Sequence, residues 1–182
     1  MLRLFSYSLS VRNHRIDCML GFALCLLMMS EIGFAQSQPP MEKIRKDTVL
    51  LQDAVNEVIN FAIPGFGVLQ KARGAQLDGF GVVVTVEIAL DSPRSPFDGQ
   101  RSPDEVRKTS NQRRKEVLDR LSNLLKQKVP ALESLEPAES VAIVVNLLNT
   151  NPADMPDMPS QIILSAKKQD AAAARIHIRE YK

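Results

Sequence analysis

Apolar residues recur at three- and four-residue steps between positions 44 and 62, with acidic and amide side chains between them. This spacing places the apolar side chains along one side of an α-helix. We therefore predict an amphipathic helix over residues 46–61. Pro64 and Gly65 follow this segment and predict its end, because proline cannot continue a helix and glycine permits the chain to turn away.

A long strand is predicted over residues 79–90, where apolar residues alternate with a period of two. The residues that share one face are Val82, Val84, Val86, Ile88 and Leu90. The opposite face is mixed, so we expect the first face to pack against helices and the second to be partly wet. Residues 66–71 predict a partner strand, and Arg73-Gly74 predicts the hairpin connection between the two.

The clearest local signal is the helix start at residues 102–105, which read Ser-Pro-Asp-Glu. Serine at the N-cap and glutamate three residues later form a capping box, and proline suits the first turn. The apolar positions of this helix concentrate after Val117, and Pro130 predicts its end. Residues 107–115 are polar all round, so we expect this half to project past the sheet or to lie in solvent.

Short apolar runs predict two further strands, over residues 141–148 and 161–167, and an alternating run over residues 175–179 predicts a candidate edge strand. Residues 149–160 contain three prolines and are therefore expected to form a loop. The predicted fold class is α+β: a mostly antiparallel sheet of four or five strands with two helices packed on one face. The expected order is α-β-β-α-β-β, followed by the candidate edge strand.

The N-terminal segment predicts a secretory signal peptide over residues 1–35. Three arginines precede an apolar run at residues 19–29, and Gly33-Phe34-Ala35 supplies a cleavage site with small residues. The alternative is a membrane anchor, but a span needs about 20 apolar residues. We therefore expect cleavage near Ala35 and a periplasmic or extracellular protein, with membrane contact only through the signal segment before cleavage.

The remaining chain predicts a flexible leader over residues 36–45 and a single α+β domain over residues 46–182. Both cysteines, Cys18 and Cys25, fall within the signal, so the mature chain lacks thiols for catalysis, metal binding or redox chemistry. The formal net charge of +2 gives no electrostatic argument for nucleic acid, and no such partner is expected.

Two Gly-Phe-Gly segments, at residues 65–67 and 79–81, raise the question of a phosphate-binding loop. A dinucleotide site needs three glycines that lead from a strand into a helix, so that the helix N-terminus meets the pyrophosphate. Here Val84 occupies the position of the third glycine, and a strand follows instead of a helix. The glycines therefore predict bends at the two ends of a hairpin, and no cofactor is expected.

Metal ligands are also scarce. His177 is the single histidine outside the signal and is expected on a solvent-facing edge strand. Asp154 and Asp157 could contribute oxygens to calcium, and Met155 and Met158 could suit Cu(I), but neither pair completes a ligand set. No metal site is predicted.

Catalysis by paired carboxylates is the alternative function that the residues leave open, because such pairs come together only in the fold. The acidic residues around the long strand are Asp78, Glu87, Asp91 and Asp98. They make a carboxylate-based hydrolase of the cell envelope the second hypothesis. The chain carries no GxSxG elbow that would indicate a serine nucleophile.

The second helix carries a cluster of basic side chains in its first half, at Arg107, Lys108, Arg113, Arg114 and Lys115. This cluster is either a solvated helix face or a contact for an anionic envelope component or protein partner. Together with the proline-rich loop, it is the surface on which we expect function to rest. The predicted function is a non-enzymatic binding or assembly module, and assembly would use strand addition at the C-terminal edge.

Overall fold

The computed structural model describes residues 41–63, 65, 67–91, 102–149, 152–153 and 155–182 of the chain. The described part from Met41 onward belongs to one compact unit, residues 39–182. The predicted signal peptide, the first half of the predicted leader, Asp98 and Asp154 lie outside the described residues. Among the described residues, no helix has the length and apolar content needed to cross a bilayer.

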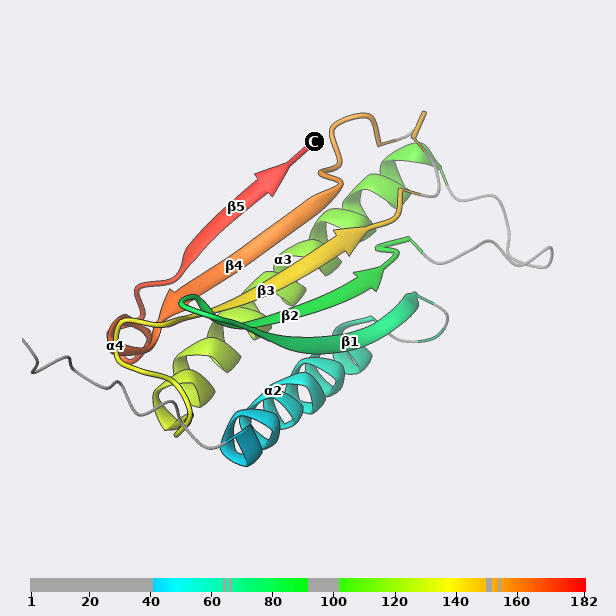
Figure 1. Cartoon of the computed structure of the whole chain (residues 1–182). Helices are drawn as coiled ribbons and strands as arrows, with labels where there is room; N and C mark the ends of the chain where they lie inside the picture. The colour runs from blue at the N-terminus through cyan, green and yellow to red at the C-terminus, as the bar shows by residue number, and fades with distance from the viewer. Residues whose placement is uncertain (1–40, 64, 66, 92–101, 150–151, 154) are drawn as a thin grey trace, which may run out of the picture. The chain divides into compact units, whose positions relative to one another are not determined.

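The centre of the fold is a five-stranded sheet in which the strands lie in sequence order (Figure 1). The strands are β1 (Val68–Leu77), β2 (Gly81–Ile88), β3 (Ser140–Leu147), β4 (Gln161–Lys167) and β5 (His177–Tyr181). Three of the four pairings are antiparallel, and β2 pairs with β3 in parallel. The α+β fold class and the mostly antiparallel sheet predicted from the sequence are confirmed.

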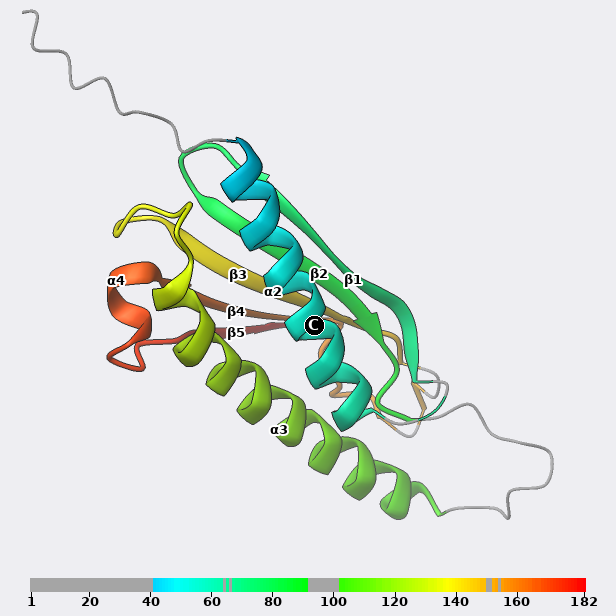
Figure 2. The ribbon, with the colours of Figure 1, turned by 90° about the horizontal axis from the view of Figure 1, so that it is seen from below.

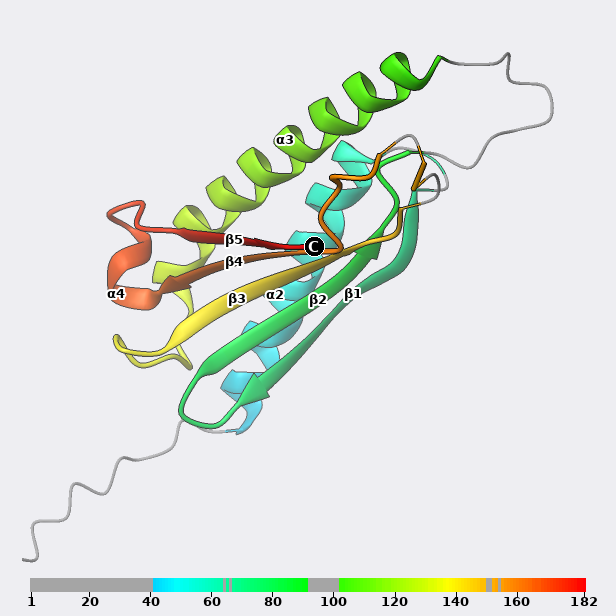
Figure 3. The same cartoon turned by 90° about the horizontal axis from the view of Figure 1, so that it is seen from above.

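Two long helices, α2 (Met41–Ala62) and α3 (Pro103–Lys128), cover one face of this sheet (Figures 2 and 3). The first begins at Met41, so residues 41–45, which were expected in the leader, are helical. A 3₁₀ turn, η2 (Val129–Ala131), follows α3, and a four-residue helix, α4 (Lys168–Ala171), follows β4. The predicted capping box at the start of α3 is present, since Ser102 and Glu105 exchange hydrogen bonds of 2.9 and 3.3 Å.

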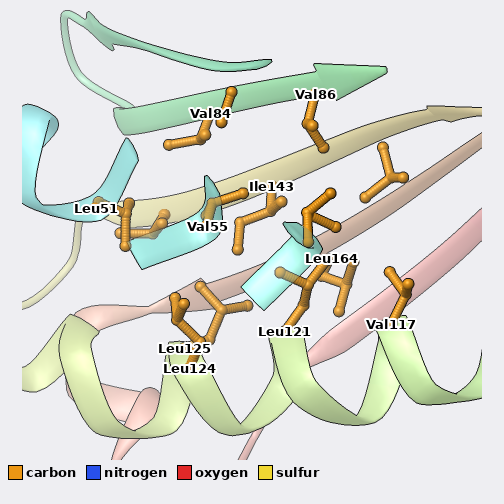
Figure 4. Close-up of a cluster of buried hydrophobic side chains, with 14 of the residues drawn as sticks. Leu51, Val55, Val84, Val86, Val117, Leu121, Leu124, Leu125, Ile143 and Leu164 are labelled. Atoms are coloured by element: carbon orange, nitrogen blue, oxygen red, sulfur yellow. The ribbon is translucent and has the colours of Figure 1, made fainter. Parts of the chain in front are cut away.

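The hydrophobic core lies between the two helices and the sheet (Figure 4). Alternate strand residues such as Val84 and Ile143 point toward the helices, as the period of two predicts. Helix α2 contributes Leu51 and Val55, which are one helical turn apart, and α3 contributes Leu121 to the same layer. Each of these side chains is fully buried, and burial of such a side chain contributes about 1.5–3 kcal/mol to folding.

The hairpin between β1 and β2 differs from the prediction at one point. Arg73 and Gly74, predicted as the connection, lie inside β1, and the turn occupies residues 78–80, where the N–H of Phe80 donates to Leu77 O over 3.1 Å. Gly74 has another role: a Cβ there would lie 2.6 Å from Cγ2 of Thr48 on α2. The prediction is wrong because glycine permits a close helix contact at this position, and sequence cannot distinguish that need from a turn.

Helix α2 covers the outer edge of β1 with two side-chain amides. The Oδ1 atom of Asn56 accepts from Ala72 N–H over 2.8 Å, and the Oε1 atom of Gln52 accepts from Gly74 N–H over 3.1 Å. Exposed strand edges attract other strands, because their backbone groups lack partners. The two amides therefore close this edge of the sheet.

Gly81 lies where β2 approaches β3, and its φ is +119°. A Cβ at this position would collide with the carbonyl oxygen of Ser140, the residue with which Gly81 pairs. Gly79 also has a positive φ, +70°, but a Cβ there would meet nothing within 4 Å. Both glycines therefore have a positive φ, but only Gly81 lies too close to a neighbouring strand to accommodate a Cβ.

We expect Gly81→Ala to lower the free energy of unfolding by about 3 kcal/mol or more. The left-handed backbone costs about 1–2 kcal/mol, and displacement of packed backbone costs about 1–3 kcal/mol more. The matched variant Gly79→Ala should lose only the backbone cost. Urea denaturation of the purified protein measures both, and equal losses would contradict the close approach at Ser140.

We expect Asn56→Ala to lower the free energy of unfolding by about 1–3 kcal/mol, because the N–H of Ala72 loses its partner. Hydrogen exchange at the Ala72 amide should accelerate in the same variant. Asn60→Ala, at an exposed position of the same helix, is the control and should change neither quantity. Unchanged exchange at Ala72 in Asn56→Ala would show that the amide of Asn56 does not close this edge.

Candidate functional site

The basic first half of α3 and the proline-rich loop before β4 are the two segments on which function was expected to rest. They face each other across one cavity. The N-terminal half of α3 forms one wall, and the loop before β4 (orange in Figure 1) forms the other. The cavity has a volume of about 450 Å³. Its lining residues are Arg107, Ser110, Asn111 and Arg114 from α3, and Met155, Pro156, Asp157 and Met158 from the loop.

Helical spacing explains why these four residues of α3 form one wall of the cavity. Positions 110, 111 and 114 lie three, four and seven residues after position 107, and such positions share one side of an α-helix. The capping box at Ser102 sets where the helix begins and so holds this register. The sequence contained this pattern, but the prediction selected basic residues by charge and therefore missed Ser110 and Asn111.

Ser110 is the unusual member of the wall. Its side chain is 3% exposed, and its Oγ has no hydrogen-bond partner among the described residues. Val106, one turn earlier, is also buried. Residues 107–115 were expected to project past the sheet or to lie in solvent. The solvent expectation is wrong at Ser110, because this side chain is buried.

The opposite wall is held by hydrogen bonds to the backbone oxygen of Met155. The Nδ2 group of Asn149 donates to Met155 O over 2.8 Å, and Met158 N–H donates to the same oxygen over 3.3 Å. Met155 is buried, and Met158 packs partly against the hydrophobic core. Methionine is flexible and polarisable, so this wall can adapt its shape to an apolar group.

Two ion pairs connect the cavity to the C-terminal strand. Nη1 of Arg114 lies 3.6 Å from Oε2 of Glu180 on β5, and the arginine side chain is 33% exposed. Nζ of Lys182 lies 3.0 Å from Oδ1 of Asp157. Surface pairs of this kind contribute about 0–1 kcal/mol each, so an incoming anion can compete for Arg114 at small cost.

The five predicted basic residues separate into three groups. Arg107 and Arg114 line the cavity. Arg113 points away from it, since its Nη1 donates to Leu90 O over 2.9 Å. Lys108 and Lys115 are exposed, and their positions on the helix place them on the side away from the sheet.

Two acidic residues of the hydrolase hypothesis, Asp78 and Glu87, lie near opposite ends of β2. Asp78 lies in the turn before β2, and Glu87 lies near the other end of that strand. The six steps from Gly81 to Glu87 span about 20 Å at strand geometry. Asp91 is buried after β2, and Asp98 lies outside the described residues.

Metal ligands are equally dispersed in the described part of the chain, where no group of three or more His, Cys, Asp or Glu side chains could hold an ion. His177 is the exposed first residue of β5. Met155 and Met158, considered for Cu(I), lie on the cavity wall.

We expect Ser110→Ala to leave the free energy of unfolding unchanged or slightly raised, because it removes a buried hydroxyl that has no partner among the described residues. Ser102→Ala in the same helix is the contrasting variant and should lose about 0.5–2 kcal/mol through the N-cap. Thermal and urea unfolding compare the two. A loss at Ser110 as large as the loss at Ser102 would assign Ser110 a structural hydrogen bond.

Comparison of the chain with protein-family models, with curated proteins and with solved structures found no match.

Proposed function

We propose that this protein is an exported, non-enzymatic binding module that holds an anionic group of an envelope partner in the cavity between α3 and the Met155–Met158 loop. One observation carries the proposal. Ser110, whose buried hydroxyl has no hydrogen-bond partner among the described residues, lines a cavity of about 450 Å³ together with two arginines. Ligand pockets have volumes of about 300–1,000 Å³.

The chemistry of the helix wall suits an oxyanion. The guanidinium group of Arg114 can present two parallel N–H donors to a carboxylate or a phosphate. Arg107, which pairs with Asp104 over 3.7 Å, adds positive charge to the same wall. Glu180, which pairs with Arg114 at 3.6 Å, already supplies one carboxylate to this wall. A ligand anion would replace Glu180 beside Arg114.

The loop wall suits a different part of the same ligand. Met155 and Met158 offer thioether side chains, which fit irregular apolar groups. The proposed ligand therefore combines an anionic head with an apolar portion. Export rests on the pattern of residues 1–35, and an envelope location would bring the cavity to lipids, polymers and proteins that carry such groups.

We expect hexanoate and hexyl phosphate to bind to the purified protein, and hexylamine not to bind. Arg114→Gln should weaken binding at least tenfold, because a charge-assisted hydrogen bond contributes about 1.5–3 kcal/mol. Lys115→Gln removes the same charge from the neighbouring position and should leave affinity unchanged. Isothermal titration calorimetry measures each affinity, and NMR shifts at Ser110 and Met158 locate the ligand.

The proposal fails if hexylamine binds as well as hexanoate, or if Lys115→Gln and Arg114→Gln weaken binding equally. Either result would indicate non-specific attraction to the helix surface. Circular dichroism of both variants checks that α3 remains folded.

A further inference from the structure

The two edges of the sheet are protected to different degrees. The edge at β1 is closed by the amides of Asn56 and Gln52 from α2. At the opposite edge, all five residues of β5 are exposed, and β4 is its one partner strand among the described strands. Alternate backbone groups of an edge strand point outward and can pair with a further strand.

The open edge leads directly to the cavity. Glu180 of β5 pairs with Arg114, and Lys182, the next residue after the strand, pairs with Asp157. Both Arg114 and Asp157 line the cavity. The C-terminal end of β5 (marked C in Figure 3) therefore lies beside the proposed anion site.

The register of β5 shows what an added strand would meet. Ile178 pairs with the buried Leu164, so it lies on the side of the sheet that faces the helices, and it remains 46% exposed. His177 and Arg179 alternate with it and lie on the open face. An added strand would thus find an apolar contact on one face and basic contacts on the other.

A second copy of this chain leaves Arg179 without an acidic partner at this edge. Antiparallel pairing about a two-fold axis places one residue opposite its own copy, and a centre at Arg179 or Glu180 would oppose like charges. A centre at Ile178 would place His177 opposite Arg179, and a centre at Tyr181 would pair Glu180 with Lys182 of the copy. None of these four registers places an acidic residue opposite Arg179, whereas an acidic segment would do so.

We infer that the free edge of β5 and the cavity form one continuous site for an extended peptide segment with alternating acidic and apolar side chains. The segment adds to the sheet by backbone hydrogen bonds to β5, and a carboxylate at one end enters the cavity. This mode of recognition is β-strand addition, in which the backbone supplies affinity and side chains supply specificity. The inference rests on the proposed function, since it uses the same anion site.

The test uses an acetylated eight-residue peptide of alternating glutamate and valine, with fluorescence anisotropy as the measurement on the full purified protein. It should bind at least tenfold more tightly than the same peptide with lysine in place of glutamate. N-methylation of the glutamates or of the valines blocks opposite edges of the peptide. One of these two modified peptides should lose at least tenfold in affinity and the other should not.

Two variants separate the edge from the cavity. Arg179→Gln on β5 should weaken peptide binding about threefold and leave hexanoate binding unchanged, because a cross-strand charge pair is a modest contribution. Arg73→Gln is the matched control, because Arg73 lies in the same cross-sheet row but on β1. Arg114→Gln should weaken the binding of both the peptide and hexanoate. Comparison of the peptide with a free C-terminus and the same peptide with an amidated C-terminus shows whether the carboxylate in the cavity is the terminal one or a side chain.

The outcomes distinguish the two proposals. If hexanoate binds as expected but both N-methylated peptides bind equally well, strand addition is overturned and the anion site stands. If the peptide binds with the expected N-methyl pattern but neither hexanoate nor Arg114→Gln has an effect, the cavity is not part of the site, and both the proposed function and the continuous site fail.

Discussion

The parallel pairing of β2 with β3 is the constraint on which the rest of the structure depends. Parallel neighbours cannot be joined by a tight turn, so the chain must return along the sheet through a crossover, and α3 is that crossover. At about 1.5 Å per residue, the 26 residues of α3 extend for about 39 Å. The eight residues of β2 extend for about 26 Å at about 3.3 Å per residue, so the crossover helix is longer than the strand that precedes it.

This excess length explains why a site can form at the start of α3. The second half of the helix buries leucines in the core, but the first half carries polar side chains around a narrow buried strip. The loop before β4 folds against that strip and leaves a cavity instead of a packed contact. The proposed anion site is therefore a consequence of a crossover helix that is longer than its sheet.

The two edges of the sheet have different neighbours. Helix α2 packs along β1, so its amides reach the backbone of that strand. At the opposite edge, all five residues of β5 are exposed, and Glu180 of this strand pairs with Arg114 of α3.

Local signals were sufficient for most elements. The capping box located the start of α3, alternation located β2, and short apolar runs located β3 and β4, each strand within two residues at each end, because these patterns reflect nearest-neighbour geometry. Gly74 was wrongly predicted to lie in a turn. Glycine is needed there because β1 lies close to Thr48 of α2, and a contact with another element leaves no local sequence pattern. The start of α2 was placed late because residues 41–45 carry little apolar periodicity.

The sequence by itself determined the α+β class, most of the elements and the two segments that form the cavity, because periodicity and turn chemistry act over a few residues. Only the tertiary structure decided that these segments face each other, that Ser110 is buried, and that Arg113 points elsewhere. Helical spacing places Arg107, Ser110 and Arg114 on one side, but which side meets the loop depends on how α3 packs. That orientation is set by the packing of Leu121 in a core that also contains residues of other elements, such as Val84, and no local pattern records which of these residues meet.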